Sequence, residues 1–227
     1  MEIIKKVEVH SREAQHLLDK RIKSGGSFVE AALTQMGKLY RLAIEQYLYP
    51  YIALIRIYGE MAHAREAMEK LISDFEQVLN VDPASSNRIK TSVKSSYEMR
   101  IGNPIVGEMV YLLELYDRLS TLLWLANNLN LFKKGDRHKY FRAVSKNSAR
   151  VMGVLKITLA FVREDDKMRL ATISQYINQD SAYLNQAERL GDIKPALLFN
   201  ALSIDAFPRF KAEERNLMRY KLKQMRI

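Results

Sequence analysis

The stretch RIKTSVKSSYEMRI, from Arg88 to Ile101, decides how the rest of the chain is interpreted, because it is the one clear strand pattern after the N-terminus. Apolar and polar side chains alternate along it, which is typical of a strand with one buried face. The expected buried face holds Val93, Tyr97, Met99 and Ile101. The expected exposed face, which is mostly basic, holds Lys90, Ser92, Lys94, Ser96, Glu98 and Arg100.

A single strand of this kind needs a partner, because an isolated strand leaves its backbone groups without hydrogen bonds. The partner is either another part of the chain or the same strand of a second copy. A self-paired ribbon with Lys and Ser side chains pointing outward fits the major groove of DNA. The plainer alternative is an ordinary sheet within one chain, in which this strand pairs with a short strand predicted near residues 3–9.

Length and composition predict a mainly α protein with one principal domain. The chain has 227 residues, of which 48% are hydrophobic, and this is ample for a packed core. We expect a helical DNA-binding and dimerisation domain over residues 1–163, with its strand near 88–101. Residues 164–227 are expected to form a helical extension with a basic tail. No internal repeat and no low-complexity tract is visible in the sequence.

The charge balance favours a polyanionic partner. The net charge is +10 and the pI is about 9.6, values that are typical of proteins that bind nucleic acid. Cysteine is absent, which excludes disulfides and thiol catalysis and suits a reducing cytoplasm. No apolar run approaches the roughly 20 residues of a membrane span, and the first ten residues lack the core of a signal peptide. The expected location is therefore the cytoplasm.

Helix signals occupy most of the remaining chain. Ser11 is a candidate N-cap, and the Ser27–Glu30 capping box opens the next helix. Pro50 is expected to interrupt that helix, with a further helix over residues 51–79. Asn103 and Pro104 predict another helix start. The apolar residues of the helix that follows alternate in steps of four and three, as in a heptad seam that could pack against a second subunit: Ile105, Met109, Leu112, Tyr116, Leu119, Leu123 and Ala126.

A second basic surface is predicted on the helix that restarts at Asp136. Lys139, Arg142, Lys146 and Arg150 share the face opposite its apolar stripe. Phosphate contact is one interpretation of this face, and a plain solvated face is the other.

Catalytic patterns are sparse. Two Glu-x-x-His pairs, Glu13 with His16 and Glu60 with His63, have the spacing of di-iron sites in helical bundles. The first pair lies on a short helix with no glutamate helix before it, so we treat a di-iron bundle enzyme as a remote alternative. No phosphate-binding glycine loop or nucleophile elbow is present. We therefore expect a protein that is not an enzyme and uses no metal or cofactor.

Two segments could form a ribbon-helix-helix unit, in which a strand precedes two helices. The first is Val7–His10 with the helices from Ser11 and Phe28, whose lengths suit a compact unit. Glu8 would then face the DNA, which is unfavourable. The second is Arg88–Ile101 with the helices from Pro104 and Asp136, which offers the better Lys and Ser face and is preferred.

Short blocks of the sequence resemble the AcaB family of regulators from conjugative plasmids and integrating conjugative elements. One block is Val9-His10-Ser11-Arg12-Glu13-Ala14-Gln15. The others are Met99-Arg100-Ile101-Gly102-Asn103-Pro104, then Leu112-Leu113, then Tyr116-Asp117-Arg118-Leu119. Their order and spacing match over roughly residues 10–162, although Ile105-Val106-Gly107 depart from the family pattern. The resemblance implies a dimeric bacterial activator of conjugation genes with a ribbon-helix-helix-like element, associated with plasmid or nucleoid.

The main hypothesis is accordingly a homodimeric regulator that reads promoter DNA with a β-ribbon, with RNA polymerase as a candidate further partner. The residues expected to contact DNA, chosen from the face analysis, are Arg88, Lys90, Ser92, Lys94, Ser96, Arg100, Lys139, Arg142 and Lys146. The principal alternative is a non-catalytic helical scaffold or accessory protein of conjugative DNA processing. It would dimerise through the seam between Ile105 and Ala126.

Overall fold

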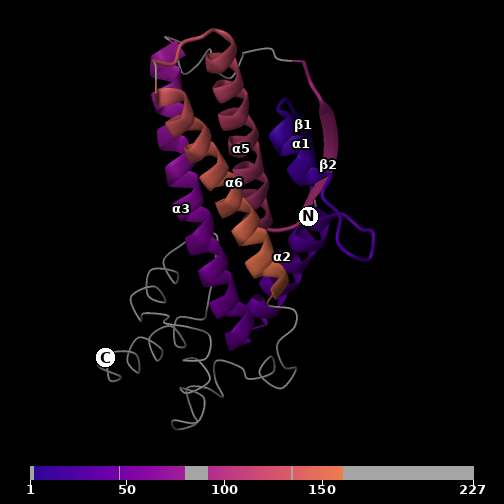
Figure 1. Cartoon of the computed structure of the whole chain (residues 1–227). Helices are drawn as coiled ribbons and strands as arrows, with labels where there is room; N and C mark the ends of the chain where they lie inside the picture. The colour runs from indigo at the N-terminus through magenta and orange to yellow at the C-terminus, as the bar shows by residue number, and fades with distance from the viewer. Residues whose placement is uncertain (1–2, 46, 80–91, 134, 161–227) are drawn as a thin grey trace, which may run out of the picture.

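The computed structural model describes residues 3–45, 47–79, 92–133 and 135–160 (Figure 1). The predicted C-terminal extension with its basic tail, and also Arg88 and Lys90, lie outside the described residues. In chain order the described elements are β1 (Ile3–Val9), α1 (Arg12–Leu18), α2 (Phe28–Ile44), α3 (Leu48–Leu79), β2 (Ser95–Ile101), α5 (Pro104–Asn128) and α6 (Asp136–Ala160). The predicted mainly helical class with a short β-ribbon is confirmed.

Local sequence explains where these helices begin. The side chains of Ser11, Ser27 and Asn103 each accept a hydrogen bond from a backbone N–H in the first turn of α1, α2 and α5. Pro50 lies inside the first turn of α3 and does not separate two long helices as expected. A proline is tolerated there because the first N–H groups of a helix have no intrahelical partner.

Helix α5 is the centre of the molecule. It packs against α3 and α6 on one side and against α1 and the two strands on the other (Figure 1). The predicted heptad seam is buried in this core: Ile105, Met109 and Leu119 are completely inaccessible to solvent. The seam is therefore not a dimer surface, which corrects the expectation. A helix covered on several sides and a helix paired in a coiled coil show the same apolar spacing, so sequence alone could not separate them.

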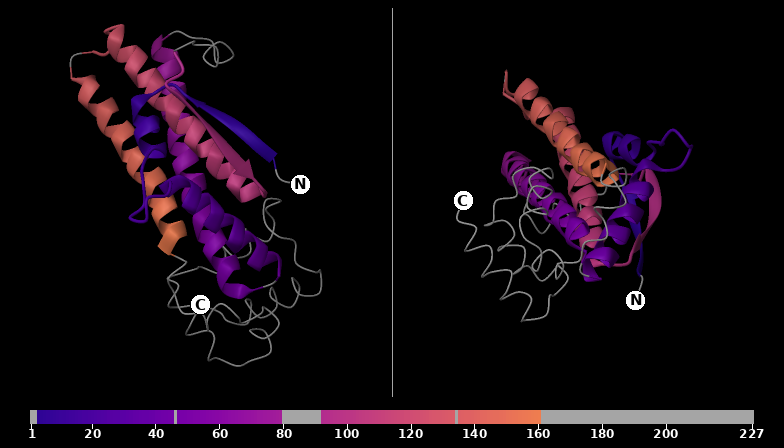
Figure 2. Two further views of the ribbon diagram at one scale, coloured as in Figure 1. Left: turned by 90° about the vertical axis from the view of Figure 1, so that its right-hand side faces the viewer. Right: turned by 90° about the horizontal axis from the view of Figure 1, so that it is seen from below.

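The two strands pair with each other in an antiparallel sheet, in a register that sets Lys6 opposite Glu98 and Val7 opposite Tyr97. The left view of Figure 2 shows them along the flank of the helical bundle. This is the intrachain alternative of the sequence analysis, and it differs from the preferred ribbon of two subunits. The predicted alternation is confirmed for β2, where Met99 is buried and Glu98 and Arg100 are exposed. Val93, which was expected on the buried face, precedes the strand and is exposed, because the described pairing begins only at Ser95.

The structure contains two units in which a strand precedes a helix, namely β1 with α1 and β2 with α5. They are equivalent at an offset of 92 residues, although the sequence showed no repeat. This offset carries Ile3–Val9 onto Ser95–Ile101, the N-cap Ser11 onto Asn103, and the first helical residue Arg12 onto Pro104. It also carries Lys6 onto Glu98, the residue that pairs with it at the middle of the sheet. The sheet therefore has a local pseudo-twofold axis at this pair, which the sequence analysis missed because the equivalent side chains differ.

Candidate nucleic-acid interface

The exposed face of the sheet is built by alternate residues of both strands. Lys6 and Glu8 of β1 form an ion pair at 3.0 Å, and both side chains are well exposed. On β2, Ser96, Glu98 and Arg100 point to the same side. The face thus carries two basic and two acidic side chains, so it is charge-balanced rather than mostly basic as expected. The difference arises because β2 begins at Ser95, so that Lys94 precedes the strand and Lys90 lies outside the described residues, while β1 adds one basic and one acidic side chain.

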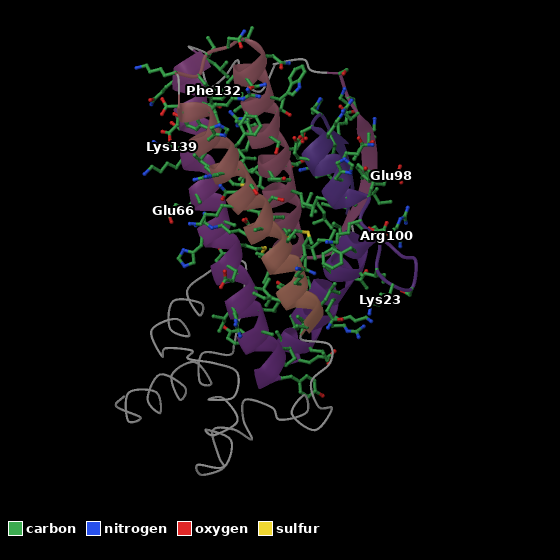
Figure 3. All side chains as sticks on the ribbon, in the orientation of Figure 1. Lys23, Glu66, Glu98, Arg100, Phe132 and Lys139 are labelled. Carbon is green, nitrogen blue, oxygen red and sulfur yellow. The ribbon has the colours of Figure 1, made fainter. Side chains whose placement is uncertain are left out.

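A basic connection lies beside this ribbon. Arg21 and Ser27, which flank the turn between α1 and α2, line one groove of about 820 Å³ together with Ser96 and Arg100 of β2. Lys20, Arg21 and Lys23 are all exposed in this connection. Figure 3 shows Lys23 on the same side of the molecule as Glu98 and Arg100. Sequence analysis missed these three basic residues, although their clustering just before Gly25 and Gly26 was a usable signal.

Tyr97 ties this connection to the ribbon. Its hydroxyl donates a hydrogen bond of 2.7 Å to Oδ1 of Asp19, the C-cap residue of α1. Partial burial, followed by this hydrogen bond, raises the pKa of the Tyr97 phenol above its ordinary value of 10.0. The neutral phenol is therefore the form that holds the basic connection against β2 at neutral pH.

A buried carboxylate fixes the corner between β1 and α1. Oδ1 of Asp117, on α5, accepts hydrogen bonds from the Ser11 backbone N–H at 2.8 Å and the Ser11 hydroxyl at 2.7 Å. The backbone N–H of His10 also donates to both carboxylate oxygens at 3.1 Å. Asp117 and Ser11 are each only 5% exposed. This contact joins two sequence blocks that carried the resemblance, because one contains His10 and Ser11 and another contains Asp117.

Helix α6 carries the second basic surface. Lys139, Arg142 and Lys146 follow each other at steps of three and four, so they share one face, and all three are exposed. Arg150 extends the stripe by a further turn, and the four residues span about 16 Å at 1.5 Å per residue. We call these four residues the α6 stripe. Within the described part of the chain, no ion pair involves the α6 stripe.

The structure does not bring all the predicted DNA-contacting residues together. Ser96 and Arg100 lie on the exposed ribbon face, and Ser92 and Lys94 are exposed just before β2. The backbone N–H of Lys94 donates to the carbonyl of Val9, which places it at the end of the sheet. Lys139 lies on the opposite side of the bundle from Glu98 and Arg100 (Figure 3). The ribbon face and the α6 stripe are therefore two separate surfaces.

The two Glu-x-x-His pairs lie on different helices. Glu13 and His16 are exposed on α1, and Glu60 and His63 are exposed on α3. In the described ranges, no three His, Asp or Glu side chains gather as a metal site would require. None of the described helices combines the length and the apolar character of a membrane span.

Comparison with known proteins gives one likeness, at the level of the fold. No protein-family model matches the chain, and no curated protein matches it. A solved structure of AcaB from uropathogenic E. coli, containing selenomethionine, is similar to the chain with a TM-score of 0.51 and 13% sequence identity. The match covers 100% of this chain and 99% of that one. The chain therefore has an AcaB-like, mainly helical fold.

Proposed function

We propose that the protein is a DNA-binding transcriptional regulator, and specifically an activator of conjugative transfer genes. The observation that carries the proposal is the two-stranded ribbon with an exposed polar face and the basic α1–α2 connection beside it. A β-ribbon of this kind is narrow enough to enter the major groove, which is about 12 Å wide. The full-length likeness to AcaB supports the same function, as does the resemblance of the short sequence blocks.

Each part of this surface has a distinct task in the proposal. Lys6 and Arg100 donate hydrogen bonds to base edges, and a basic side chain facing a guanine is the commonest such contact. Glu8 and Glu98 favour cytosine over other bases, because a carboxylate accepts a hydrogen bond from the cytosine amino group and repels phosphate. Lys20, Arg21 and Lys23 hold phosphates and set the register of the ribbon. An activator at promoters would also contact RNA polymerase, and a homodimer would present two such surfaces.

The test is a binding titration with labelled DNA from upstream of conjugative transfer genes, read by fluorescence anisotropy. The double variant Lys6→Ala with Arg100→Ala should bind the specific site at least about 30-fold more weakly, since each good base contact is worth about 1–3 kcal/mol and two are removed. The matched control is Lys70→Ala with Lys156→Ala, which removes two exposed positive charges from α3 and α6. Equal affinity losses in the two double variants would reject the ribbon as the reading surface.

Activation is tested separately with a promoter–reporter fusion in bacterial cells. The wild-type protein should raise reporter output, and the Lys6 and Arg100 double variant should not. A reporter that rises when the protein is deleted would show repression and would reject the activator part of the proposal.

The α6 stripe favours a second candidate, an accessory protein that binds DNA without sequence preference during conjugative DNA processing. Four basic side chains along one helix can follow a phosphate backbone. This candidate predicts equal affinity for transfer promoters and for unrelated DNA of the same length. If the protein is a regulator, its affinity for the specific site should be at least about 1,000-fold tighter than its affinity for unrelated DNA at physiological salt.

A further inference from the structure

We infer that one chain forms a complete ribbon-helix-helix unit and reads a DNA site whose two halves differ, an inference that rests on the proposed function. In ribbon-helix-helix proteins such as Arc and MetJ, β-ribbons read the major groove. Two identical subunits give such a ribbon a true twofold axis, and the DNA site is then palindromic. Here both strands belong to one chain.

The pseudo-twofold axis is the first support for a complete unit. The offset of 92 residues relates both strands, both N-caps and both helix starts. The central pair, Lys6 with Glu98, joins residues equivalent at this offset. A ribbon made from two identical strands around a twofold axis would pair each central residue with its own copy in the same way. Neither strand therefore needs a strand of a second subunit to complete the two-stranded ribbon.

Packing beneath the strands repeats in the same manner. Val7 and its equivalent Met99 are both buried under the sheet. The Ser11 hydroxyl accepts from the N–H of Ala14, and the Asn103 side chain accepts from the N–H of Val106, which is again the same position in each unit. The second helices of the two units, α2 and α6, also pack against each other. The equivalence therefore extends from the strands into the core.

The exposed faces of the two strands, by contrast, are not equivalent. Lys6 corresponds to Glu98, so the charge is reversed at the centre of the ribbon. Glu8 corresponds to Arg100, which is a second reversal, and Ile4 corresponds to Ser96. A twofold-symmetric DNA site presents the same groups to both strands, and these strands cannot both satisfy it. The half-site under β1 must differ from the half-site under β2.

The flanks of the ribbon differ as well. Helix α1 has only seven residues, so the α1–α2 connection returns to line the groove beside β2. Helix α5 has 25 residues and is about 37 Å long, so it carries the start of α6 to the far end of the bundle (Figure 1). Among the described residues, the connection between the two helices of a unit therefore lies beside the ribbon only at β2, and this difference gives the bound protein a fixed direction on DNA.

The experiment is selection of bound sequences from random double-stranded DNA by the full-length protein, with the stoichiometry of the selected complex measured by native mass spectrometry. The expected stretch read by one ribbon has no internal dyad, and the complex holds one chain for each such stretch, so a homodimer would occupy two of them. A palindromic motif occupied by two chains that share one ribbon would overturn the inference and leave the proposed function standing. Failure to select any motif above non-specific binding would overturn both.

A variant with matched strands tests the asymmetry of the ribbon. Lys6→Glu with Glu8→Arg gives β1 the same side chains as the equivalent Glu98 and Arg100 of β2 and leaves the net charge unchanged. We expect this variant to select a motif with an internal dyad and to bind the wild-type motif about 10-fold more weakly or worse. Selection of the wild-type motif by this variant would overturn the inference. The single variants Lys6→Ala and Arg100→Ala, both at exposed positions, should each lose affinity for a different half of the motif, and loss on the same half would also overturn it.

Discussion

The ribbon face and the α6 stripe are both candidate surfaces for a polyanion, but they differ in charge and shape. The ribbon face mixes basic and acidic side chains with the exposed Ile4 on two strands, and its flank carries three basic residues, Lys20, Arg21 and Lys23, beside the acidic Asp19 and Glu30. The α6 stripe has four basic residues in a line with no carboxylate among them. Phosphate contacts position a protein on DNA, whereas contacts to base edges specify the sequence. The surface with less net charge is therefore the better candidate for specificity.

Their positions sharpen this comparison. Figure 3 places Lys139 and Glu66 on one side of the bundle, and Lys23, Glu98 and Arg100 on the other. A straight duplex bound to the ribbon would not reach the α6 stripe. Helix α3, which packs beside α6, has five acidic and three basic residues, and this lowers the attraction of that side for DNA. Net charge along the sequence could not show which basic residues work together.

The largest effect, on the free energy of unfolding, is expected when the contact of Asp117 with the β1–α1 connection is removed. Asp117→Ala removes the acceptor of three donors and leaves the buried Ser11 N–H without its charged partner. The free energy of unfolding should fall by about 3 kcal/mol, since hydrogen bonds to buried charged groups are worth about 1.5–3 kcal/mol each before relaxation. Chemical denaturation measures this, with the exposed Glu66→Ala as control, expected within about 0.5 kcal/mol of wild type. A loss below about 1 kcal/mol for Asp117→Ala would contradict the role of this contact.

The next largest effect, on the salt dependence of DNA affinity, is expected at the flank of the ribbon. The triple variant Lys20→Ala, Arg21→Ala and Lys23→Ala removes the three phosphate contacts that we propose for the α1–α2 connection. The slope of log affinity against log salt should become shallower by about 2.7, at about 0.9 per phosphate. The selected sequence should stay the same, because these residues do not read bases. Anisotropy titrations at several salt concentrations measure the slope, and an unchanged slope would remove the α1–α2 connection from the interface.

A smaller effect is expected for the contact that orients this flank. Tyr97→Phe deletes the hydrogen bond to Asp19 and should lower the free energy of unfolding by about 0.5–1 kcal/mol, as is typical of a partly exposed hydrogen bond. The raised pKa of Tyr97 means that its contribution is complete below pH 10 and declines as pH rises through the folded-state pKa. Wild type and Tyr97→Phe should therefore converge in stability in alkaline solution. If the difference in free energy of unfolding between the two proteins widened as pH rises, the pKa of Tyr97 would be lowered on folding and not raised.

The smallest effect on specific binding is expected from the α6 stripe. Lys139→Ala with Arg142→Ala and Lys146→Ala removes as much charge as the triple variant of the flank. Affinity for the selected motif near physiological salt should change less than about twofold, because screening weakens charges farther away than the Debye length of about 8 Å. Affinity for unrelated DNA at low salt should fall. A loss on the motif as large as that of the flank variant would place both surfaces on the same DNA.

The sequence by itself determined the local features of this protein. The N-caps at Ser11, Ser27 and Asn103 and the alternation along β2 depend on neighbouring residues only, and each could be predicted from spacing. The basic residues of α6 share a face for the same reason. These features follow from backbone hydrogen bonding and side-chain period, which are fixed within a few residues.

Only the tertiary structure decided which segments meet. The partner of β2, the pseudo-twofold axis at Lys6 and Glu98, and the contact of Asp117 with Ser11 all join residues about 90 or more positions apart. The apolar spacing along α5 is compatible with a dimer seam and with a monomer core. The burial of Ile105 and Leu119 within one chain shows that it is a core. Such choices depend on how the whole chain covers its apolar surface, because the hydrophobic effect is non-directional and rewards burial against any partner.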